Sequence, residues 1–504
     1  MPDGTLSRKY TFYKELQAAM ELKRVGVIIY SMKNSLLSVL FTLPLIAYAD
    51  GLPDLGDVSQ EIISPQVERQ IGEQSMFQIR ASNTYLDDPE ISDYLNHLGG
   101  RLVVNSSEPG DAFEFFAIND DAINAFALPG GFVGVNTGLI LLAQDESELA
   151  SVLGHEISHV TQHHYARMVY GQRYDSLAAL ATLAVAILAA RNSPDAATAG
   201  IVGAQAGTIQ HQLNFTRQNE READRFGLAT LEKSGFDTRA MPAFFERMQK
   251  ATQLVEGNTP SYLRTHPVTH ERIAEVENRV EQIPYHLVPD SLDFQLIRSR
   301  IIATQRPPRE AVAFFDDALG AKKFGNPIAH RYGLVLALLR DNQPQRAIRE
   351  FAILQKQAPV NATIATLGGR IIQLEKPDKD VIAYYSTELK NFPEHHALIY
   401  DYAEVLLQDQ RYTDALKLLD DQVNRDGNDP KLYDLEARAY AALGRRQEEH
   451  HMLAYLHILH GDLAGTIEQL ELAKQAGNDY YQLSTIETEL KQYREIAAAY
   501  SKKK

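Results

Sequence analysis

Beyond residue 300 one short pattern recurs every 34 residues, and this period limits the possible folds of the region more than any other feature. In each copy a small or aliphatic residue is followed four positions later by a large apolar one. The copies begin at Ala347 with Phe351, Val381 with Tyr385, and Ala415 with Leu419. Ala311 starts an earlier copy 36 residues before Ala347, while Glu449 keeps the register without the small residue. A 34-residue helix–turn–helix period is the tetratricopeptide signature, so we expect a stacked α-solenoid.

The solenoid is expected to occupy residues 288–504, with its boundary between 288 and 305. Pro289, Pro307 and Pro308 interrupt the helical pattern in this region. The concave face of such an array is suited to binding a protein or peptide. The alternative is that the array only stabilises the preceding domain. No part of it carries a catalytic pattern.

Residues 155–159 read His-Glu-Ile-Ser-His and indicate a metal site. On a helix the two imidazoles, His155 and His159, lie one turn apart on the same face and can reach one ion. Glu156 is then placed to take a proton from water rather than to bind the metal. Asp145 and Glu148 are arranged as a capping box at the start of this helix. Together these features are typical of a zinc peptidase.

A third metal ligand is expected on a helix that spans about residues 211–234. Glu220 and Asp224 share one face of it, and Glu222 points nearly the other way. We assign Glu220 to the metal because its longer side chain can reach across from a facing helix, and Asp224 to a hydrogen bond with a ligand histidine. The alternative is a solvated helix with Glu–Arg pairs. The chain has no cysteine, so a thiolate site is excluded.

The histidines after the pentapeptide are less suited to binding the same ion. His163 continues the row of His155 and His159, but it lies eight residues, or about 12 Å along the axis, beyond His155. Three imidazoles spread over that length cannot share one ion. We therefore interpret His163 and His164 as surface groups or as supports for the ligands.

Three motifs in order resemble the HtpX-like and CAAX-prenyl-protease-like gluzincin metallopeptidases over residues 60–285. They are Asn-Ala-Phe-Ala-Leu-Pro-Gly-Gly at 124–131, the pentapeptide, and Glu220-x-x-x-Asp224. The resemblance implies a zincin-type α+β domain with a small sheet, so that the whole chain is mainly α. It also implies one zinc ion per chain. The implied metal ligands are His155, His159 and Glu220, and the implied catalytic residues are Glu156 and Asp224.

Thr265-His266-Pro267, followed by Arg272, resembles a further element of that family. His266 could stabilise the oxyanion, or it could occupy the position of the attacking water and hold the enzyme latent. Residues 131–136 follow a Pro-Gly-Gly turn and are expected to form a strand. If that strand lies at the sheet edge beside the metal it can pair with an extended substrate, and otherwise it is part of a structural hairpin.

The N-terminus has the pattern of a secretory signal peptide that begins at an internal methionine. A charged start at residues 32–34 precedes an apolar run and an Ala-Tyr-Ala site before Asp50. We therefore expect residues 1–31 to be a mis-assigned upstream extension, 32–49 the signal peptide and 50–287 the peptidase domain. From residue 50 the chain has 44 basic and 63 acidic side chains, a net charge of −19. That charge argues against nucleic acid as a partner.

The longest apolar run of the remaining chain is residues 177–190, which is too short to cross a bilayer. We expect a buried or capping helix beside the site. A peripheral membrane contact and a lid over the cleft are the alternatives.

A secreted gluzincin followed by tetratricopeptide repeats resembles the β-barrel assembly-enhancing proteases of the Gram-negative periplasm. The resemblance implies a periplasmic endopeptidase and chaperone-like factor. Its substrates would be unfolded or misassembled outer-membrane proteins, and its repeats would contact the β-barrel assembly machinery. The alternative is a mostly latent protease that acts as a scaffold.

Overall fold

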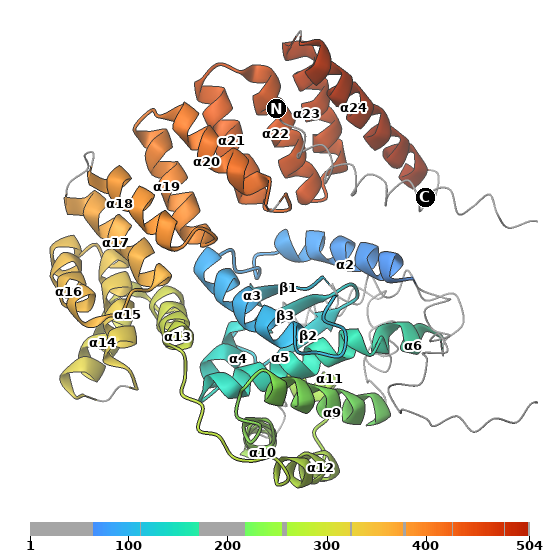
Figure 1. Ribbon diagram of the computed structural model, residues 1–504, viewed down its shortest axis with the longest axis vertical. Helices are drawn as coiled ribbons and strands as arrows, with labels where there is room; N and C mark the ends of the chain where they lie inside the picture. Colours follow the sequence, from blue (N-terminus) through green and yellow to red (C-terminus); the bar gives the residue numbers. More distant parts are fainter. Residues whose placement is uncertain are drawn as a thin grey trace, which may run out of the picture.

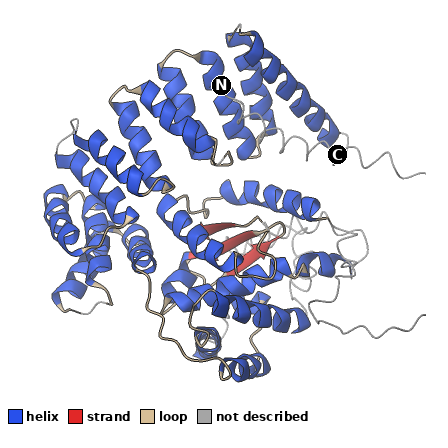
Figure 2. Ribbon diagram, viewed as in Figure 1, coloured by secondary structure: helices blue, strands red, loops and turns tan. Residues whose placement is uncertain are grey.

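The computed structural model describes residues 64–501, apart from 171–216, 255–259 and short gaps at 111, 323–324, 376–379, 426 and 478. The expected signal peptide, the upstream extension and the apolar run at 177–190 therefore lie outside the described residues. Among the helices that are described, none combines the length and apolarity needed to cross a membrane. The fold is mainly helical with one small sheet, as expected (Figure 2).

The sheet contains three strands in the order β1-β3-β2 (Figure 1). β3 (Phe132–Asn136) lies in the centre, parallel to β1 (Glu114–Ile118) and antiparallel to β2 (Ala125–Leu128). The strand expected at 131–136 is thus present, and of the two alternatives the structural hairpin is the one found, because β3 is the central strand. The chain reverses at Gly130 and Gly131, which both have positive φ, so that β2 folds back along β3 and takes the outer position.

The peptidase domain surrounds the sheet with helices (Figure 1). α5 (Glu146–Thr161) is buried along almost its whole length. Asp145 caps it, with Oδ1 accepting a hydrogen bond from the Glu148 backbone N–H at 2.9 Å. The Glu148 carboxylate accepts from the backbone N–H of Gln144 at 2.7 Å, one residue before the cap. The remaining helices are α2 (Pro65–Arg80), α3 (Pro89–Val103), α4 (Thr137–Leu142), α6 (His164–Tyr170), α9 (Arg217–Lys233), α10 (Ala240–Leu254), α11 (Ser261–Thr265) and α12 (His270–Val280).

The helices of residues 292–501 form the stacked hairpins that the 34-residue period predicts. The first residues of the copies at Ala311, Ala347 and Ala415 are fully buried between helices. The array consists of α13 (Leu292–Gln305), α14 (Pro308–Gly320), α15 (Pro327–Arg340), α16 (Pro344–Gln357), α17 (Ala362–Glu375), α18 (Asp380–Asn391), α19 (His396–Gln408), α20 (Tyr412–Val423), α21 (Pro430–Ala442), α22 (Arg446–Leu459), α23 (Leu463–Ala476) and α24 (Tyr480–Ser501).

α13 belongs to both parts of the molecule. Its Phe294, Ile297 and Ile301 lie in the core of the peptidase domain, while Leu296 and Ala303 lie in the core of the first repeats. Because one helix is apolar on both sides, the two domains share a continuous interior at this point rather than a flexible linker.

Polar contacts extend this junction to α3. Asp88 caps α3, and both of its carboxylate oxygens share the Nε–H of Arg300, at 2.7 and 2.8 Å. Glu90, in the first turn of α3, accepts a hydrogen bond from Thr363 Oγ1 at 2.7 Å. Its other contact in the array is His395 Nε2 at 3.0 Å. The repeats therefore curve around α3 and hold it through charged groups that are buried (Figure 1).

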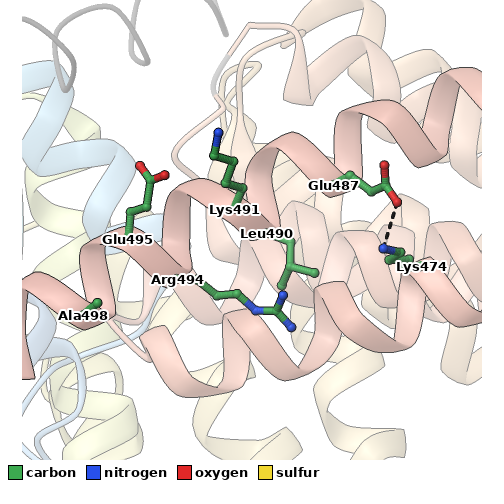
Figure 3. A pocket seen from close by; sticks show the side chains of 7 residues that line it. All are labelled: Lys474, Glu487, Leu490, Lys491, Arg494, Glu495 and Ala498. Carbon is green, nitrogen blue, oxygen red and sulfur yellow. Dashed lines mark ion pairs between the residues drawn. The ribbon is translucent and has the colours of Figure 1, made fainter.

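A cavity of about 360 Å³ lies between α23 and α24 at the far end of the array. Lys474 and Glu487 form an ion pair of 2.8 Å at its side (Figure 3). None of its lining residues belongs to the histidine and carboxylate motifs of the peptidase domain. We therefore do not assign the cavity to the catalytic site.

Candidate metal centre

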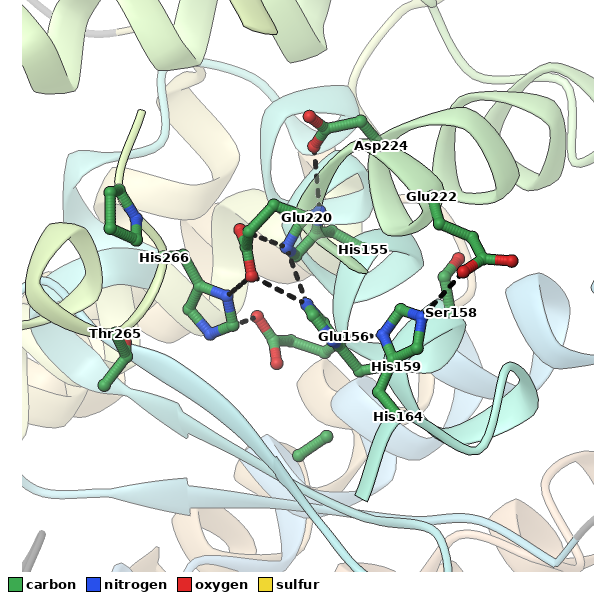
Figure 4. Close-up of polar contacts among 12 residues, drawn as sticks. His155, Glu156, Ser158, His159, His164, Glu220, Glu222, Asp224, Thr265 and His266 are labelled. Atoms are coloured by element: carbon green, nitrogen blue, oxygen red, sulfur yellow. Dashed lines mark hydrogen bonds and ion pairs between the residues drawn. The ribbon is translucent and has the colours of Figure 1, made fainter. Parts of the chain in front are cut away.

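Four buried side chains from three helical segments converge on one point (Figure 4). They are His155 and His159 of α5, Glu220 of α9, and His266 at the C-terminal end of α11. Their ligand atoms all lie within 4.8 Å of one another. Glu220 is thus brought to the two histidines as the sequence predicts, and His266 joins them as a fourth group.

Helical geometry alone places His155 and His159 side by side on α5. The position of Glu220 depends instead on how closely α9 approaches α5. Gly227 of α9 faces Gly154 of α5, and a Cβ added at Gly227 would lie 3.0 Å from the His155 backbone nitrogen. Two glycines therefore let the helix backbones touch. Glu220 lies seven residues before Gly227, on the same face of α9. Its carboxylate comes within 3.6 Å of His155 Nε2 and 3.5 Å of His159 Nε2.

The donor set fits a zinc ion. The two Nε2 atoms of His155 and His159 face each other at 3.0 Å, and each ring directs its other nitrogen to a partner outside the cluster. Two imidazole nitrogens and one carboxylate oxygen are the ligands of many catalytic zinc sites. All four side chains are at most 2% exposed, so the charges of the cluster are shielded from water.

The electrostatics of the cluster are set by burial and by two nearby carboxylates. Burial opposes protonation of His155, but hydrogen bonding to Asp224 and Glu220 outweighs it and raises the pKa to about 9. His159 has its pKa lowered by burial and by the neighbouring His155. Burial would raise the pKa of Glu220, but the charges of His266 and Arg272 hold it well below its usual value. Glu220 is therefore an anion ready to bind a cation.

Asp224 lies behind the cluster, where the sequence predicts it. Its Oδ1 is 3.0 Å from Nδ1 of His155. Arg272 of α12 binds the same carboxylate through Nε and one terminal nitrogen, both at 2.7 Å. The other terminal nitrogen lies 2.7 Å from Glu220 and donates to the Pro267 carbonyl at 2.7 Å. Arg272 thus ties α9 to the loop that carries His266.

The role of Arg272 is the main feature that sequence reasoning missed. The residue is only 3% exposed, and α12 buries it together with Ile273 and Val276. A polar residue in the buried row of an amphipathic helix is the signal that could have identified it.

Glu156 points toward the cluster from α5 (Figure 4). It is 1% exposed, and its Oε1 has no hydrogen-bond partner among the described residues. Nε2 of His266 lies 3.6 Å from this oxygen. A buried carboxylate oxygen without a partner is costly to fold, which indicates that this atom is kept for chemistry.

Tyr262 also lies buried beside the cluster. Its ring packs against that of His266 with centroids 4.8 Å apart, and its hydroxyl has no hydrogen-bond partner in the described part of the chain. Burial and the charge of Glu156 raise its pKa, so the hydroxyl keeps its proton and remains a donor. The sequence offered no signal for this residue.

The two histidines after the pentapeptide have different environments. His163 is on the surface side, with Nε2 3.5 Å from Glu108. His164 is fully buried, and its Nδ1 lies 2.7 Å from Nδ1 of His159. Glu222, which leaves the face of Glu220 as expected, lies against His164 instead, at 3.4 Å.

Comparison with known proteins identifies a family for each of the two domains. Peptidase family M48 matches residues 89–280, and a tetratricopeptide repeat family matches 379–439. The beta-barrel assembly-enhancing protease of Escherichia coli K12 is 34% identical, over 84% of this chain and 87% of its own. A Vibrio cholerae protein given the same name provisionally is 37% identical, over 81% and 85%.

A more distant relative covers the peptidase part. The mitochondrial metalloendopeptidase OMA1 of Schizosaccharomyces pombe is 30% identical over 36% of this chain and 51% of its own. Among the described residues, the one buried group that could hold a metal is of the M48 type, which conventionally binds zinc. The chain is therefore an M48 metalloendopeptidase with tetratricopeptide repeats and belongs to the family of beta-barrel assembly-enhancing proteases.

Proposed function

We propose that the protein is a periplasmic endopeptidase and chaperone-like factor that acts on outer-membrane β-barrel proteins. The observation that carries the peptidase activity is the buried group of His155, His159 and Glu220 beside the carboxylate of Glu156, whose Oε1 has no hydrogen-bond partner among the described residues. The substrate class and the compartment rest on the relatives named for β-barrel assembly.

Each side chain has a role in peptide hydrolysis. His155, His159 and Glu220 would hold zinc, which supplies Lewis-acid polarisation of the substrate carbonyl and of water when bound. Glu156 accepts the proton of the attacking water and passes it to the leaving amine. Asp224 and Arg272 keep the His155 ring and the Glu220 carboxylate in place.

His266 holds the site in a latent state in this proposal. Its Nδ1 is 3.0 Å from Glu220 and its Nε2 is 3.6 Å from Glu156, so its ring lies between a metal ligand and the catalytic base. A substrate carbonyl and its attacking water need the same space. Withdrawal of the loop at residues 265–267 would open the site, and the alternative role of His266 as an oxyanion donor would require the ring to stay.

The edge of the sheet offers a place for an extended substrate. β2 is the outer strand beside α5. The backbone N–H of Asn136 donates to the Asn124 carbonyl, so residues 124, 126 and 128 direct their peptide groups toward β3. The peptide groups of Ala125 and Ala127 between them face away from β3, toward the open side of the strand. The Ala127 carbonyl accepts a hydrogen bond from the Tyr165 hydroxyl at 2.6 Å. A substrate strand that pairs with β2 would displace this hydroxyl. Recognition would then be mostly through the main chain.

The repeats are proposed to contact the β-barrel assembly machinery, as a helical array with a protein-binding surface. The second candidate function is a scaffold whose protease is mostly latent. The buried position of His266 between Glu220 and Glu156 favours it. The two functions can coexist in one chain.

The test separates cleavage from support of assembly. Glu156→Gln keeps the shape of the side chain and removes the base, so we expect metal binding and fold to persist while cleavage of an unfolded outer-membrane protein falls at least 100-fold. Glu246→Gln, on the exposed face of α10 and paired with Lys250, is the matched control. His266→Ala is expected to raise cleavage.

Undiminished cleavage by Glu156→Gln would refute the peptidase mechanism. Reduced cleavage by His266→Ala would assign the ring to the oxyanion instead of to latency. Full support of barrel assembly by Glu156→Gln, in cells that lack the wild-type protein, would favour the scaffold.

A further inference from the structure

His159 needs a hydrogen-bond acceptor that the pentapeptide does not supply. Its Nε2 faces the metal cluster, 3.0 Å from Nε2 of His155 and 3.5 Å from Glu220. A neutral imidazole that binds metal through Nε2 carries its proton on Nδ1 and donates it to an outer partner. For His155 that partner is the carboxylate of Asp224.

We propose that His164 is the positioning residue for His159. Its Nδ1 lies 2.7 Å from Nδ1 of His159, and its side chain is fully buried. Because His159 Nδ1 is the donor, Nδ1 of His164 is the acceptor and its proton sits on Nε2. That nitrogen faces the Glu222 carboxylate at 3.4 Å, and Arg167 holds Glu222 at 2.7 Å.

The two rings meet because of a backbone reversal and not because of helix periodicity. On one continuous helix, residues five apart point about 140° away from each other. Here α5 ends at Thr161, and His163 takes a left-handed conformation with φ of 49°. α6 then begins at His164 in a new direction, which turns its ring back onto His159.

The two metal-binding histidines are therefore supported unequally. His155 contacts the anionic carboxylate of Asp224 in α9, while His159 contacts the neutral imidazole of His164 after the turn that ends its own helix. Both supports end on α9, since Asp224 and Glu222 both belong to that helix. We infer that this second chain, from His159 through His164 to Glu222 and Arg167, orients the His159 ring for the metal. The inference rests on the metal centre of the proposed peptidase.

The experiment measures zinc affinity of the full chain by competition with a chromophoric chelator, and the d–d absorption of the Co²⁺-loaded protein. His164→Phe keeps the volume and removes the acceptor, and we expect it to raise the zinc Kd about 10–100-fold and to change the Co²⁺ spectrum. His164→Asn retains an acceptor oxygen and should restore most of the affinity. His163→Asn, which tolerates the left-handed backbone, is the matched control and should leave both readouts unchanged.

Glu222→Gln provides a second route to the same answer if His164→Phe does not fold. Glu222 is partly exposed, so its replacement spares the core, and we expect a Kd several-fold higher than that of the wild type. The inference would be overturned if the folded His164→Phe variant kept the affinity and the Co²⁺ spectrum of the wild type. If His164→Phe does not fold, the same result for Glu222→Gln would overturn it. Failure of the wild type itself to bind zinc would instead overturn the proposed function.

Discussion

Glu90 is one of the buried carboxylates that join the peptidase domain to the repeats. It is 2% exposed and lies between Thr363 Oγ1 at 2.7 Å and His395 Nε2 at 3.0 Å. The positive charge of Arg300 also attracts the Glu90 carboxylate. Nδ1 of His395, on the other side of the ring, lies 3.2 Å from the Asp93 carboxylate. Glu90→Gln keeps the shape of this side chain and an acceptor for the threonine, and it removes the charge.

The expected magnitude follows from the pKa of Glu90. Burial raises this pKa, but the hydrogen bond and charge of His395, with help from Arg300, lower it from 4.5 to about 2. Each unit by which the pKa is lowered corresponds to about 1.4 kcal/mol, so the lowered pKa of Glu90 amounts to about 3 kcal/mol in favour of the folded, ionised state. Since the amide keeps one hydrogen bond, we expect Glu90→Gln to lower the free energy of unfolding by about 2–3 kcal/mol at pH 6.

The assay is urea unfolding combined with hydrogen exchange, because a two-domain chain need not unfold in one step. Amides of α3 and α19 should lose protection first in Glu90→Gln. Glu404→Gln is the matched control: its partner Arg438 is exposed, and loss of such a pair costs about 1 kcal/mol or less. Equal stability of the two variants, with unchanged exchange in α3, would refute this reasoning.

The pH dependence has a definite sign. Glu90 has a lowered pKa, so its contribution is present above pH 4.5 and is lost as the pH falls toward 2. His395 has a pKa raised above 6.5 because the bond to Glu90 outweighs burial, so its contribution is present below pH 6.5 and is lost as the pH rises through the raised value. The difference between wild type and Glu90→Gln should therefore be largest between about pH 4.5 and 6.5.

Two further predictions concern glycines at close contacts. Gly227→Val should push α9 away from the backbone of α5, displace Glu220 and weaken zinc binding by at least 10-fold in a chelator competition, while wild-type affinity would contradict the proposed contact. Gly369→Ala would place a Cβ 2.2 Å from the buried Tyr385 ring, and the overlap, about 1–3 kcal/mol, should exceed the helix-propensity gain of about 1 kcal/mol. Thermal unfolding should show the loss, whereas the control Gly320→Ala, which meets nothing within 4 Å, should be neutral or stabilising.

Motifs whose geometry is local could be predicted from the sequence. The spacing of His155 and His159 places both rings on one side of α5 in any fold, and the aspartate cap at residue 145 needs only its own helix. The 34-residue register likewise predicted which residues are buried in the repeats, because helix pairs with the same period bury the same positions. Glu220 was reached through a family resemblance and through side-chain length.

Contacts between distant segments were decided only by the tertiary structure. A strand pattern gives no order within a sheet, so β2 rather than β3 became the edge through the Gly130–Gly131 reversal. Arg272 reaches Asp224, which lies 48 residues earlier in the chain, and also Glu220, and Glu90 meets His395 across some 300 residues.

His164 shows the physical reason most clearly. The sequence places it five positions after His159, where a helix would turn it away, and one left-handed residue at His163 reverses that outcome. Helical periodicity therefore determined the two ligands and the repeat register by itself, because it acts within a few residues. The support of those ligands depends on backbone reversals and on the close approach of α5 and α9, which exist only in the folded chain.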